Sequence, residues 1–175
     1  MSCPVGFKNG TDGNLKIAID AVGAAAHPHH FLTVTKAGYL SIFETTGNED
    51  GHVILRGGQS PNYDRKSVSR AAQMLESAGC SPRLMVDFSH ANSGKQHRGQ
   101  ITVGADVSSQ LAQGENRVVG VMIESHLVEG RQDVVAGSNL VYGQSITDAC
   151  LGWDDTIQVI GQLAEAVDTR RSLAR

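Results

Sequence analysis

The apolar positions of this chain fall into four short runs, and each run ends abruptly in polar side chains. Runs of this kind, containing β-branched residues, are typical of strands buried on both faces of a parallel sheet. The four predicted strands span 2–8, 52–58, 83–92 and 118–124. The third is the most informative, because its apolar part stops in Ser89-His90-Ala91-Asn92.

Apolar side chains recur at helical spacing in the segments between and after these strands. The predicted helices span 14–26, 65–77, 99–112 and 153–169. A strand followed by a helix, four times in succession, predicts an α/β fold with parallel strands joined by right-handed crossovers. Four such units make either half of a (β/α)8 barrel or a small open sheet, and the pattern alone favours neither. With 175 residues and 40% apolar content, we expect residues 1–175 to form a single domain.

Two segments depart from this alternation. The β-rich runs 31–35 and 39–43, separated by Lys36-Ala37-Gly38, predict a β-hairpin inserted between the first helix and the second core strand. The segment 131–142 is long for a loop in a compact domain, which indicates a functional role. We expect the residues from Ser145 to Asp148 to open the last helical region.

Charge and cysteine usage narrow the class of protein. The chain carries 15 basic and 18 acidic residues, and the basic ones are scattered, so we expect neither a nucleic-acid groove nor a membrane-binding surface. No apolar run approaches the ~20 residues that a transmembrane helix needs, and no signal-peptide pattern is present. Cys3, Cys80 and Cys150 are widely separated, so we expect small buried thiols rather than disulfides, and a cytoplasmic location.

Polar residues that follow parallel strands collect at one edge of the sheet, where α/β proteins carry their chemistry. His90 and Glu124 each follow an apolar run, and Asp148 lies before the last predicted helix. One imidazole and two carboxylates suit a divalent transition metal such as Mn²⁺, Fe²⁺ or Co²⁺. The alternative is that these are ordinary loop residues, with Asp148 serving a helix N-terminus.

Lys8 and Arg56 each end a strand and precede glycine-rich backbone. Two cations beside exposed N–H groups predict a site for a phosphate or carboxylate. Lys8 could instead form a Schiff base, or both residues could be solvated cations.

The remaining histidines and the common catalytic motifs change this picture little. His27, His29 and His30 lie in a predicted turn, where we expect exposed side chains, and His126 could contact a metal ligand from the second coordination sphere. The chain contains no dinucleotide-binding glycine motif, no Walker loop and no Gly-x-Ser-x-Gly motif, which argues against nucleotide cofactors and serine hydrolysis.

Several long segments resemble one family, the type I 3-deoxy-D-arabino-heptulosonate 7-phosphate (DAHP) synthases of the feedback-regulated kind. The resemblance covers essentially the whole chain. It is carried by residues 2–13, 54–58 with 61–63, 87–92, 124–130 and 145–153.

The resemblance implies a transferase of the aldol type that condenses phosphoenolpyruvate with erythrose 4-phosphate to give DAHP and phosphate. This is the first step of the shikimate pathway to aromatic amino acids. It implies that His90, Glu124 and Asp148 bind the metal, that Lys8 and Arg56 bind phosphoenolpyruvate, and that Asp148 also contacts substrate. Lys8, Arg56 and His90 would then be the catalytic residues. The implied fold is the last four βα units of a TIM barrel, a half-barrel with an inserted hairpin.

The chain also departs from the family pattern. Family members are about twice as long, and the metal-binding cysteine and the Lys-Pro-Arg-Thr segment of the first half have no counterpart here. We therefore expect either association with a missing N-terminal half or a homo-oligomer. A different metal-dependent aldolase or hydrolase remains an alternative. So does a non-catalytic remnant that binds metal or phosphorylated ligands, or pairs with a full-length synthase.

Overall fold

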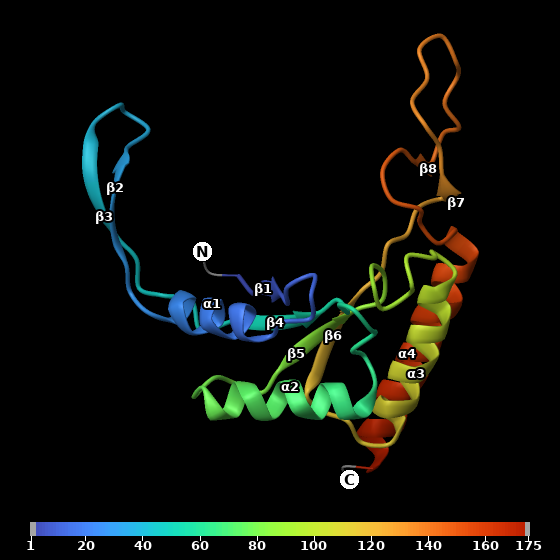
Figure 1. The fold of residues 1–175 in the computed structure, drawn as a ribbon, viewed down its shortest axis with the longest axis horizontal. Helices are drawn as coiled ribbons and strands as arrows, with labels where there is room; N and C mark the ends of the chain where they lie inside the picture. The colour runs from blue at the N-terminus through green and yellow to red at the C-terminus, as the bar shows by residue number, and fades with distance from the viewer. Residues whose placement is uncertain (1–2, 174–175) are drawn as a thin grey trace.

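A four-stranded parallel sheet organises the fold of the chain. The computed structural model describes residues 3–173. Its strands are β1 (Val5–Lys8), β4 (Gly51–Leu55), β5 (Leu84–Asp87) and β6 (Val118–Met122), hydrogen-bonded in the order β1-β4-β5-β6. Every pairing is parallel, so the four strands end at the same edge (Figure 1). The predicted α/β fold with a parallel sheet is confirmed.

A helix follows each core strand. These are α1 (Lys16–Ala26), α2 (Arg65–Ser77), α3 (Gly99–Ala112) and α4 (Trp153–Leu173). The bounds of α2 and α3 match the predicted ones, whereas α4 continues four residues beyond the predicted end. The start of α2 is fixed by Asp64, whose carboxylate accepts hydrogen bonds from the backbone N–H groups of Lys66 and Ser67.

The two faces of the sheet are buried to different extents. Val53 and Leu55 of β4 and Val86 of β5 are fully buried against the helices. The alternate residues Ile54 and Met85 are only half-buried, and no helix among residues 3–173 covers their side (Figure 1). The expectation of strands buried on both faces is therefore wrong for this chain, because its helices lie on one side of the sheet.

A β-hairpin projects from the sheet after α1. It consists of β2 (His30–Val34) and β3 (Leu40–Glu44), paired antiparallel as the sequence predicts (Figure 1). Its apolar side chains gain little burial within this chain: Leu32, Leu40 and Ile42 are each about 70% exposed.

The segment 131–142 forms a second projection (Figure 1). Its base is a short parallel pair that the sequence did not predict, β7 (Val128–Arg131) with β8 (Gln144–Ser145). The Gln132 carboxamide ties the two sides of the projection together through the backbone N–H and C=O of Val141, each at 2.8 Å. The projection is thus a defined arm.

Two expectations about the end of the chain and the cysteines are wrong. Asp148 does not open a helix: Cys150 and Leu151 form isolated β-bridges with Gly130 and Ser125, and α4 begins only at Trp153. Extended backbone at 150–151 therefore separates Asp148 from α4. The cysteines are free but not buried: Cys3 is exposed, and Cys80 and Cys150 are partly exposed. Among residues 3–173, none of the helices is both long and apolar enough to cross a membrane.

Candidate metal centre

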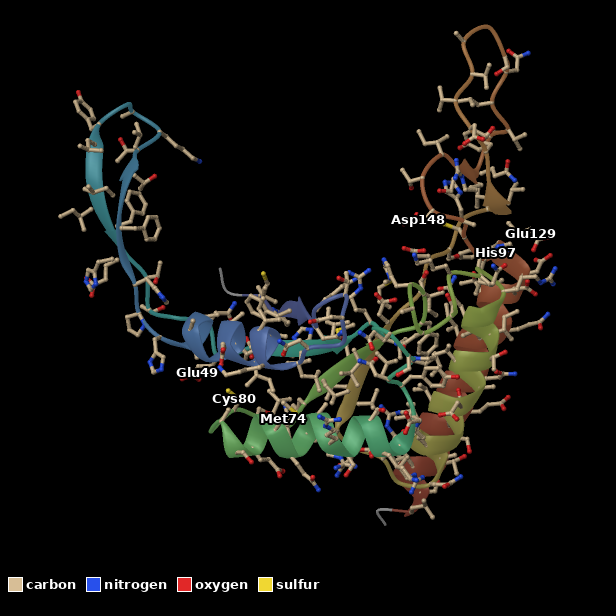
Figure 2. The ribbon with its side chains drawn as sticks, viewed as in Figure 1. Glu49, Met74, Cys80, His97, Glu129 and Asp148 are labelled. Carbon is tan, nitrogen blue, oxygen red and sulfur yellow. The ribbon has the colours of Figure 1, made fainter. Side chains whose placement is uncertain are left out.

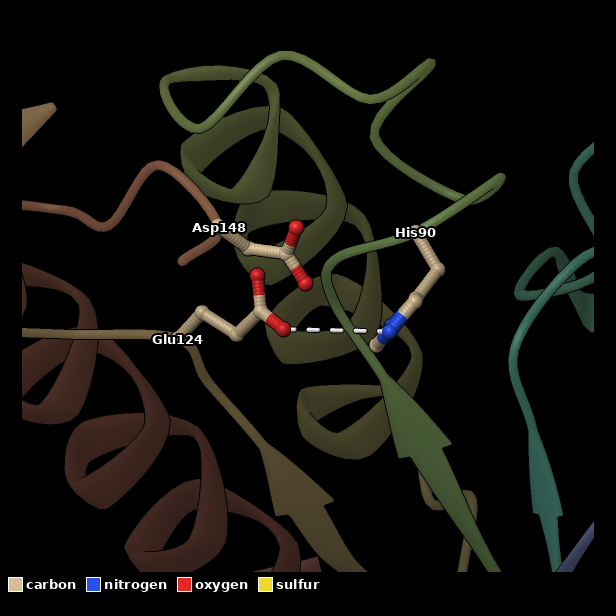
Figure 3. A group of neighbouring side chains, drawn as sticks. All are labelled: His90, Glu124 and Asp148. Atoms are coloured by element: carbon tan, nitrogen blue, oxygen red, sulfur yellow. Dashed lines mark ion pairs between the residues drawn. The ribbon is translucent and has the colours of Figure 1, made fainter. Parts of the chain in front are cut away.

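His90, Glu124 and Asp148 come together at the edge where the parallel strands end. His90 follows β5, Glu124 follows β6, and Asp148 follows β8 (Figure 3). One ligand atom from each lies within 4.8 Å of the other two, and the His90 Nε2 to Glu124 Oε1 distance is 3.7 Å. The structure thus brings together the three residues, distant from one another in the chain, that the sequence predicts as metal ligands.

The spacing of these atoms fits a single ion. Nitrogen and oxygen ligands lie about 2.1 Å from a small divalent cation, so two ligands on opposite sides of it are roughly 4.2 Å apart. The observed spacing of at most 4.8 Å is close to this value. His90 and Glu124 are only about one-fifth exposed, whereas Asp148 is exposed and leaves the site open on its side.

The backbone of His90 holds its side chain in this site. His90 has a φ of 55°, in the left-handed region, as does Lys95 with 61°. Such a conformation costs on the order of 1–3 kcal/mol for a residue with a side chain. Lys95 donates a backbone hydrogen bond to the His90 carbonyl at 2.8 Å, and Asn92 binds the carbonyls of Asp87 and Leu55. The loop therefore keeps His90 in place despite the cost.

Glu124 is held by groups that no sequence motif singles out. The buried Gln100 of α3 donates to the Glu124 carbonyl at 3.0 Å and accepts from its N–H at 2.8 Å. Ser89 Oγ donates to Glu124 Oε2 at 2.7 Å. A glutamine inside an amphipathic helix is ordinarily an exposed residue, so only its spatial neighbour shows what it does.

Asp87 is a second residue that sequence reasoning missed. Its side chain is fully buried, and its Oδ2 atom lies 2.8 Å from both Lys8 Nζ and His90 Nδ1. The available signal was a carboxylate closing an apolar strand, a position at which an ionised group requires partners.

The two predicted anion-binding cations differ in position. Arg56 lines a cavity of about 430 Å³ that also borders His90, Glu124 and Asp148, and Lys95 and His97 add basic groups to its wall. Lys8 is paired with Asp87, and its side chain is 36% exposed. The loop after Arg56 lies tightly against the His90 loop: Gly57 has a φ of 75°, and a Cβ there would lie 2.8 Å from Asn92 N.

The other histidines lie away from the three proposed ligands or do not bind them. His27, His29 and His30 are exposed as expected, although His30 does have a carboxylate neighbour, Glu44, at 3.3 Å. His126, which the sequence leaves open as a second-sphere residue, is exposed, and its Nδ1 accepts from the backbone N–H of Leu127; within residues 3–173 no hydrogen bond joins it to Glu124.

A cluster of charged residues lies at the base of the arm. His97 lies 3.6 Å from Glu129, on β7 (Figure 2). Arg98 joins Glu129 to Asp155 of α4, at 3.3 and 3.5 Å. These contacts fix the arm against the start of α4, beside the segment that carries Asp148.

The Cys150 thiol borders the same region. Burial raises its pKa, a hydrogen bond with Ser145 opposes this, and the charges of Glu124 and Asp148 raise it further. The negative potential of two neighbouring carboxylates is what a cation site requires.

Fold and site together define an α/β protein with a potential divalent-metal site at the carboxyl edge of a parallel sheet. Residues 1–160 match the model of the DAHP synthetase I family, so the chain belongs to that family. The family expected from the sequence motifs is thereby confirmed.

Three relatives illustrate the match. The Phe-sensitive phospho-2-dehydro-3-deoxyheptonate aldolase of Escherichia coli K12 is 57% identical over 171 residues, covering 98% of this chain and 49% of the relative. A putative enzyme of the same name from Schizosaccharomyces pombe is 53% identical, covering 98% and 48%. The structure of phospho-2-dehydro-3-deoxyheptonate aldolase from Francisella tularensis SCHU S4 superposes with a TM-score of 0.91 at 46% identity, covering 97% of this chain and 50% of that one. The chain thus spans about half the length of the relatives it matches.

Proposed function

We propose that this chain provides the metal-binding half of the active site of a DAHP synthase. The reaction is the condensation of phosphoenolpyruvate with erythrose 4-phosphate to DAHP and phosphate. The observation that carries this proposal is the convergence of His90, Glu124 and Asp148 beside the cavity lined by Arg56, in a chain of the DAHP synthetase I family.

In this proposal His90, Glu124 and Asp148 hold a divalent cation, Mn²⁺, Fe²⁺ or Co²⁺. When bound, such a cation would polarise the aldehyde of erythrose 4-phosphate as a Lewis acid. Asp148 is the most exposed of the three, so it is also placed to meet that substrate at the open side of the site.

Arg56 and Lys8 hold the anionic groups of phosphoenolpyruvate. Charge-assisted hydrogen bonds from two cations on neighbouring strands would fix its orientation and so direct its C3 toward the aldehyde. Lys8 would bind while still held by Asp87, since over a third of its side chain is exposed.

We further propose that residues 1–175 are one domain that corresponds to the last four βα units of a TIM barrel. Within residues 3–173 the strands β1 and β6 have free edges, and the face bearing Ile54 and Met85 is uncovered. A closed barrel would remove both edges and bury that face. We therefore expect turnover to require a second half, supplied by another polypeptide segment or by a second copy of the chain. We place the reaction in the cytoplasm, where the three free thiols would remain reduced.

The test is formation of DAHP by the purified chain with Mn²⁺, alone and after co-expression with the N-terminal half of the Escherichia coli relative. We expect turnover only in the combined preparation, with phosphate released only when both substrates are present. Glu124→Gln in the same preparation is the matched negative control. Turnover by the chain alone at the rate of the combined preparation would refute the need for a second half. Phosphate release without erythrose 4-phosphate would indicate a hydrolase instead.

A second candidate is a non-catalytic module that pairs with a full-length synthase. It is favoured by the uncovered sheet face and by the exposed apolar side chains of the β2–β3 hairpin. Light scattering of the chain alone and mixed with a full-length relative distinguishes the two. A stable mixed complex that adds no activity to the relative would support the module.

A further inference from the structure

Asp87 is a fully buried carboxylate that lies between the two parts of the site. Its Oδ1 accepts a hydrogen bond from Ser89 N at 2.9 Å. Its Oδ2 lies 2.8 Å from Lys8 Nζ and 2.8 Å from His90 Nδ1. One oxygen atom thus faces a group proposed to bind the anion and a group proposed to bind the metal.

The loop after β5 directs His90 toward this oxygen. His90 is three residues beyond Asp87, and its left-handed backbone turns its side chain back over the end of the strand. Asn92 secures the turn through the Asp87 carbonyl at 2.8 Å. Within residues 3–173 the buried His90 Nδ1 has no hydrogen-bond partner, and Asp87 Oδ2 lies 2.8 Å from it.

The contact decides which ring nitrogen is free to bind a cation. A carboxylate 2.8 Å from Nδ1 favours the tautomer with its proton on that nitrogen, which leaves Nε2, 3.7 Å from Glu124 Oε1, available to a cation. Carboxylates placed in this way behind a ligating histidine fix its orientation and increase its basicity.

Lys8 competes for the same oxygen. Its ammonium group is partly exposed, whereas Asp87 is closed to solvent, so Asp87 acts only through its neighbours. A strong Lys8 contact withdraws part of the Oδ2 charge from His90. Removal of Lys8 would leave that charge to the imidazole alone.

We infer that Asp87 is a positioning residue that links the anion-binding Lys8 to the metal-binding His90 through one shared carboxylate oxygen. This inference deepens the proposed function and rests on its metal site. It has a specific consequence: Lys8 controls metal affinity by way of Asp87, since within residues 3–173 no hydrogen bond or ion pair joins Lys8 to any of the three proposed ligands.

The test is a double-mutant cycle on the affinity of the full 175-residue chain for Mn²⁺, measured by calorimetry without substrates. We expect Asp87→Asn to weaken Mn²⁺ binding about 10- to 100-fold, as outer-sphere carboxylates typically do. We expect Lys8→Met to tighten binding several-fold in the wild-type background and to have less than about a twofold effect beside Asp87→Asn.

Arg56→Met is the matched control. It removes a cation from the same cavity, but within residues 3–173 no hydrogen bond or ion pair joins Arg56 to Asp87. Its effect on Mn²⁺ affinity should therefore be the same in both backgrounds. Asp64→Ala removes a helix cap instead, so it should lower stability and leave Mn²⁺ affinity unchanged, which separates positioning from general loss of stability.

The outcomes are distinct. An absence of Mn²⁺ binding by the wild-type chain would overturn the metal site and this inference together. Equal affinities of wild type and Asp87→Asn, or a Lys8→Met effect of the same size in both backgrounds, would overturn the inference alone. If Asp87→Asn does not fold, the single variants Lys8→Met and Arg56→Met are compared instead. Lys8→Met must then increase Mn²⁺ affinity several-fold more than Arg56→Met does. Equal effects of the two variants would overturn the inference.

Discussion

Two carboxylates buried at different places in this molecule are used in different ways. Glu115, just after α3, forms a two-pronged ion pair with Arg117, with distances of 2.8 and 2.6 Å. Asp87, at the end of β5, shares a single oxygen between Lys8 and His90. Both are almost fully buried, so burial alone does not distinguish them.

The difference lies in how completely each carboxylate and its partners are satisfied. The Glu115 carboxylate has one cationic partner, Arg117, in a fork-like arrangement. Its backbone carbonyl accepts a hydrogen bond from Arg170 of α4. Glu115 therefore joins the end of α3 to the start of β6 and to α4. Around Asp87, a histidine nitrogen lacks a well-aligned partner and the histidine backbone is strained. Complete pairing is typical of a structural ion pair, whereas incomplete pairing and strain are typical of a functional site.

The largest expected effect is at the proposed metal ligands. Glu124→Gln removes a charged ligand while keeping its shape, so Mn²⁺ affinity should fall at least as much as the roughly 100-fold upper range for outer-sphere changes. The free energy of unfolding should change little, because Glu124 is partly exposed. Calorimetric Mn²⁺ titration and thermal unfolding together check this. Unchanged Mn²⁺ binding would remove Glu124 from the site.

Glu115→Gln should show the opposite profile. Removing one partner of a buried pair can cost 3–5 kcal/mol, but Arg117 is 30% exposed and can turn to water, so we expect about 2 kcal/mol of lost stability. Mn²⁺ affinity should be unchanged. Urea unfolding gives the stability, with the exposed Glu76→Gln as the control. A loss of Mn²⁺ binding would show that the two carboxylates are not separable.

The helix cap should have a smaller effect. Asp64→Ala removes the acceptor of two backbone N–H groups at the start of α2 and should lower stability by about 1 kcal/mol. The same urea unfolding experiment measures it, and Asp64→Asn should keep most of the wild-type stability, because asparagine is also a good helix cap. Equal stability of the alanine variant and wild type would mean that solvent satisfies the start of the helix.

The smallest effect is on the pH dependence of stability. The Arg117 side chain lowers the pKa of Glu115, with burial opposing it. Burial raises the pKa of Asp64, but hydrogen bonds from Ser67 and Lys66 outweigh it, so this pKa also lies below its ordinary value. Carboxylates with depressed folded-state pKa values stabilise the fold above their unfolded pKa, and this contribution is lost as pH falls through the folded pKa.

We therefore expect stability to be level near neutral pH and to fall below about pH 4, where unfolded carboxylates begin to bind protons. Glu115→Gln should flatten that part of the profile. Urea midpoints between neutral pH and strongly acidic pH measure both curves. Parallel curves for the variant and wild type would assign the acid sensitivity to other groups.

Much of the architecture was predictable because its signals are local. The bounds of α2 and α3 follow from helical spacing of apolar residues, and the β2–β3 hairpin follows from two β-rich runs around Gly38. The expected helical opening at 145–148 failed because long-range bridges, such as Gly130 with Cys150, hold the following residues in extended backbone. Pairing between residues far apart in the chain also explains why the sequence did not predict the β7–β8 pair.

The metal-ligand candidates could also be predicted from the sequence, because parallel strands must end at the same edge. The residues that surround these candidates could not be predicted. Gln100 has the sequence context of an ordinary helix residue, and only the proximity of Glu124 shows its role. His126 is adjacent in sequence to the same site, yet its exposed ring turns to its own backbone.

The sequence by itself determined the alternation of strands and helices and the polar residues that close each strand. Local spacing encodes these features without reference to the rest of the chain. Only the tertiary structure decided that Lys8 meets Asp87 across 79 positions, that one oxygen contacts both Lys8 and His90, and that within residues 3–173 no helix covers one face of the sheet. These depend on the order of the strands and on which side the helices pack, and both are set by contacts between residues far apart in the chain.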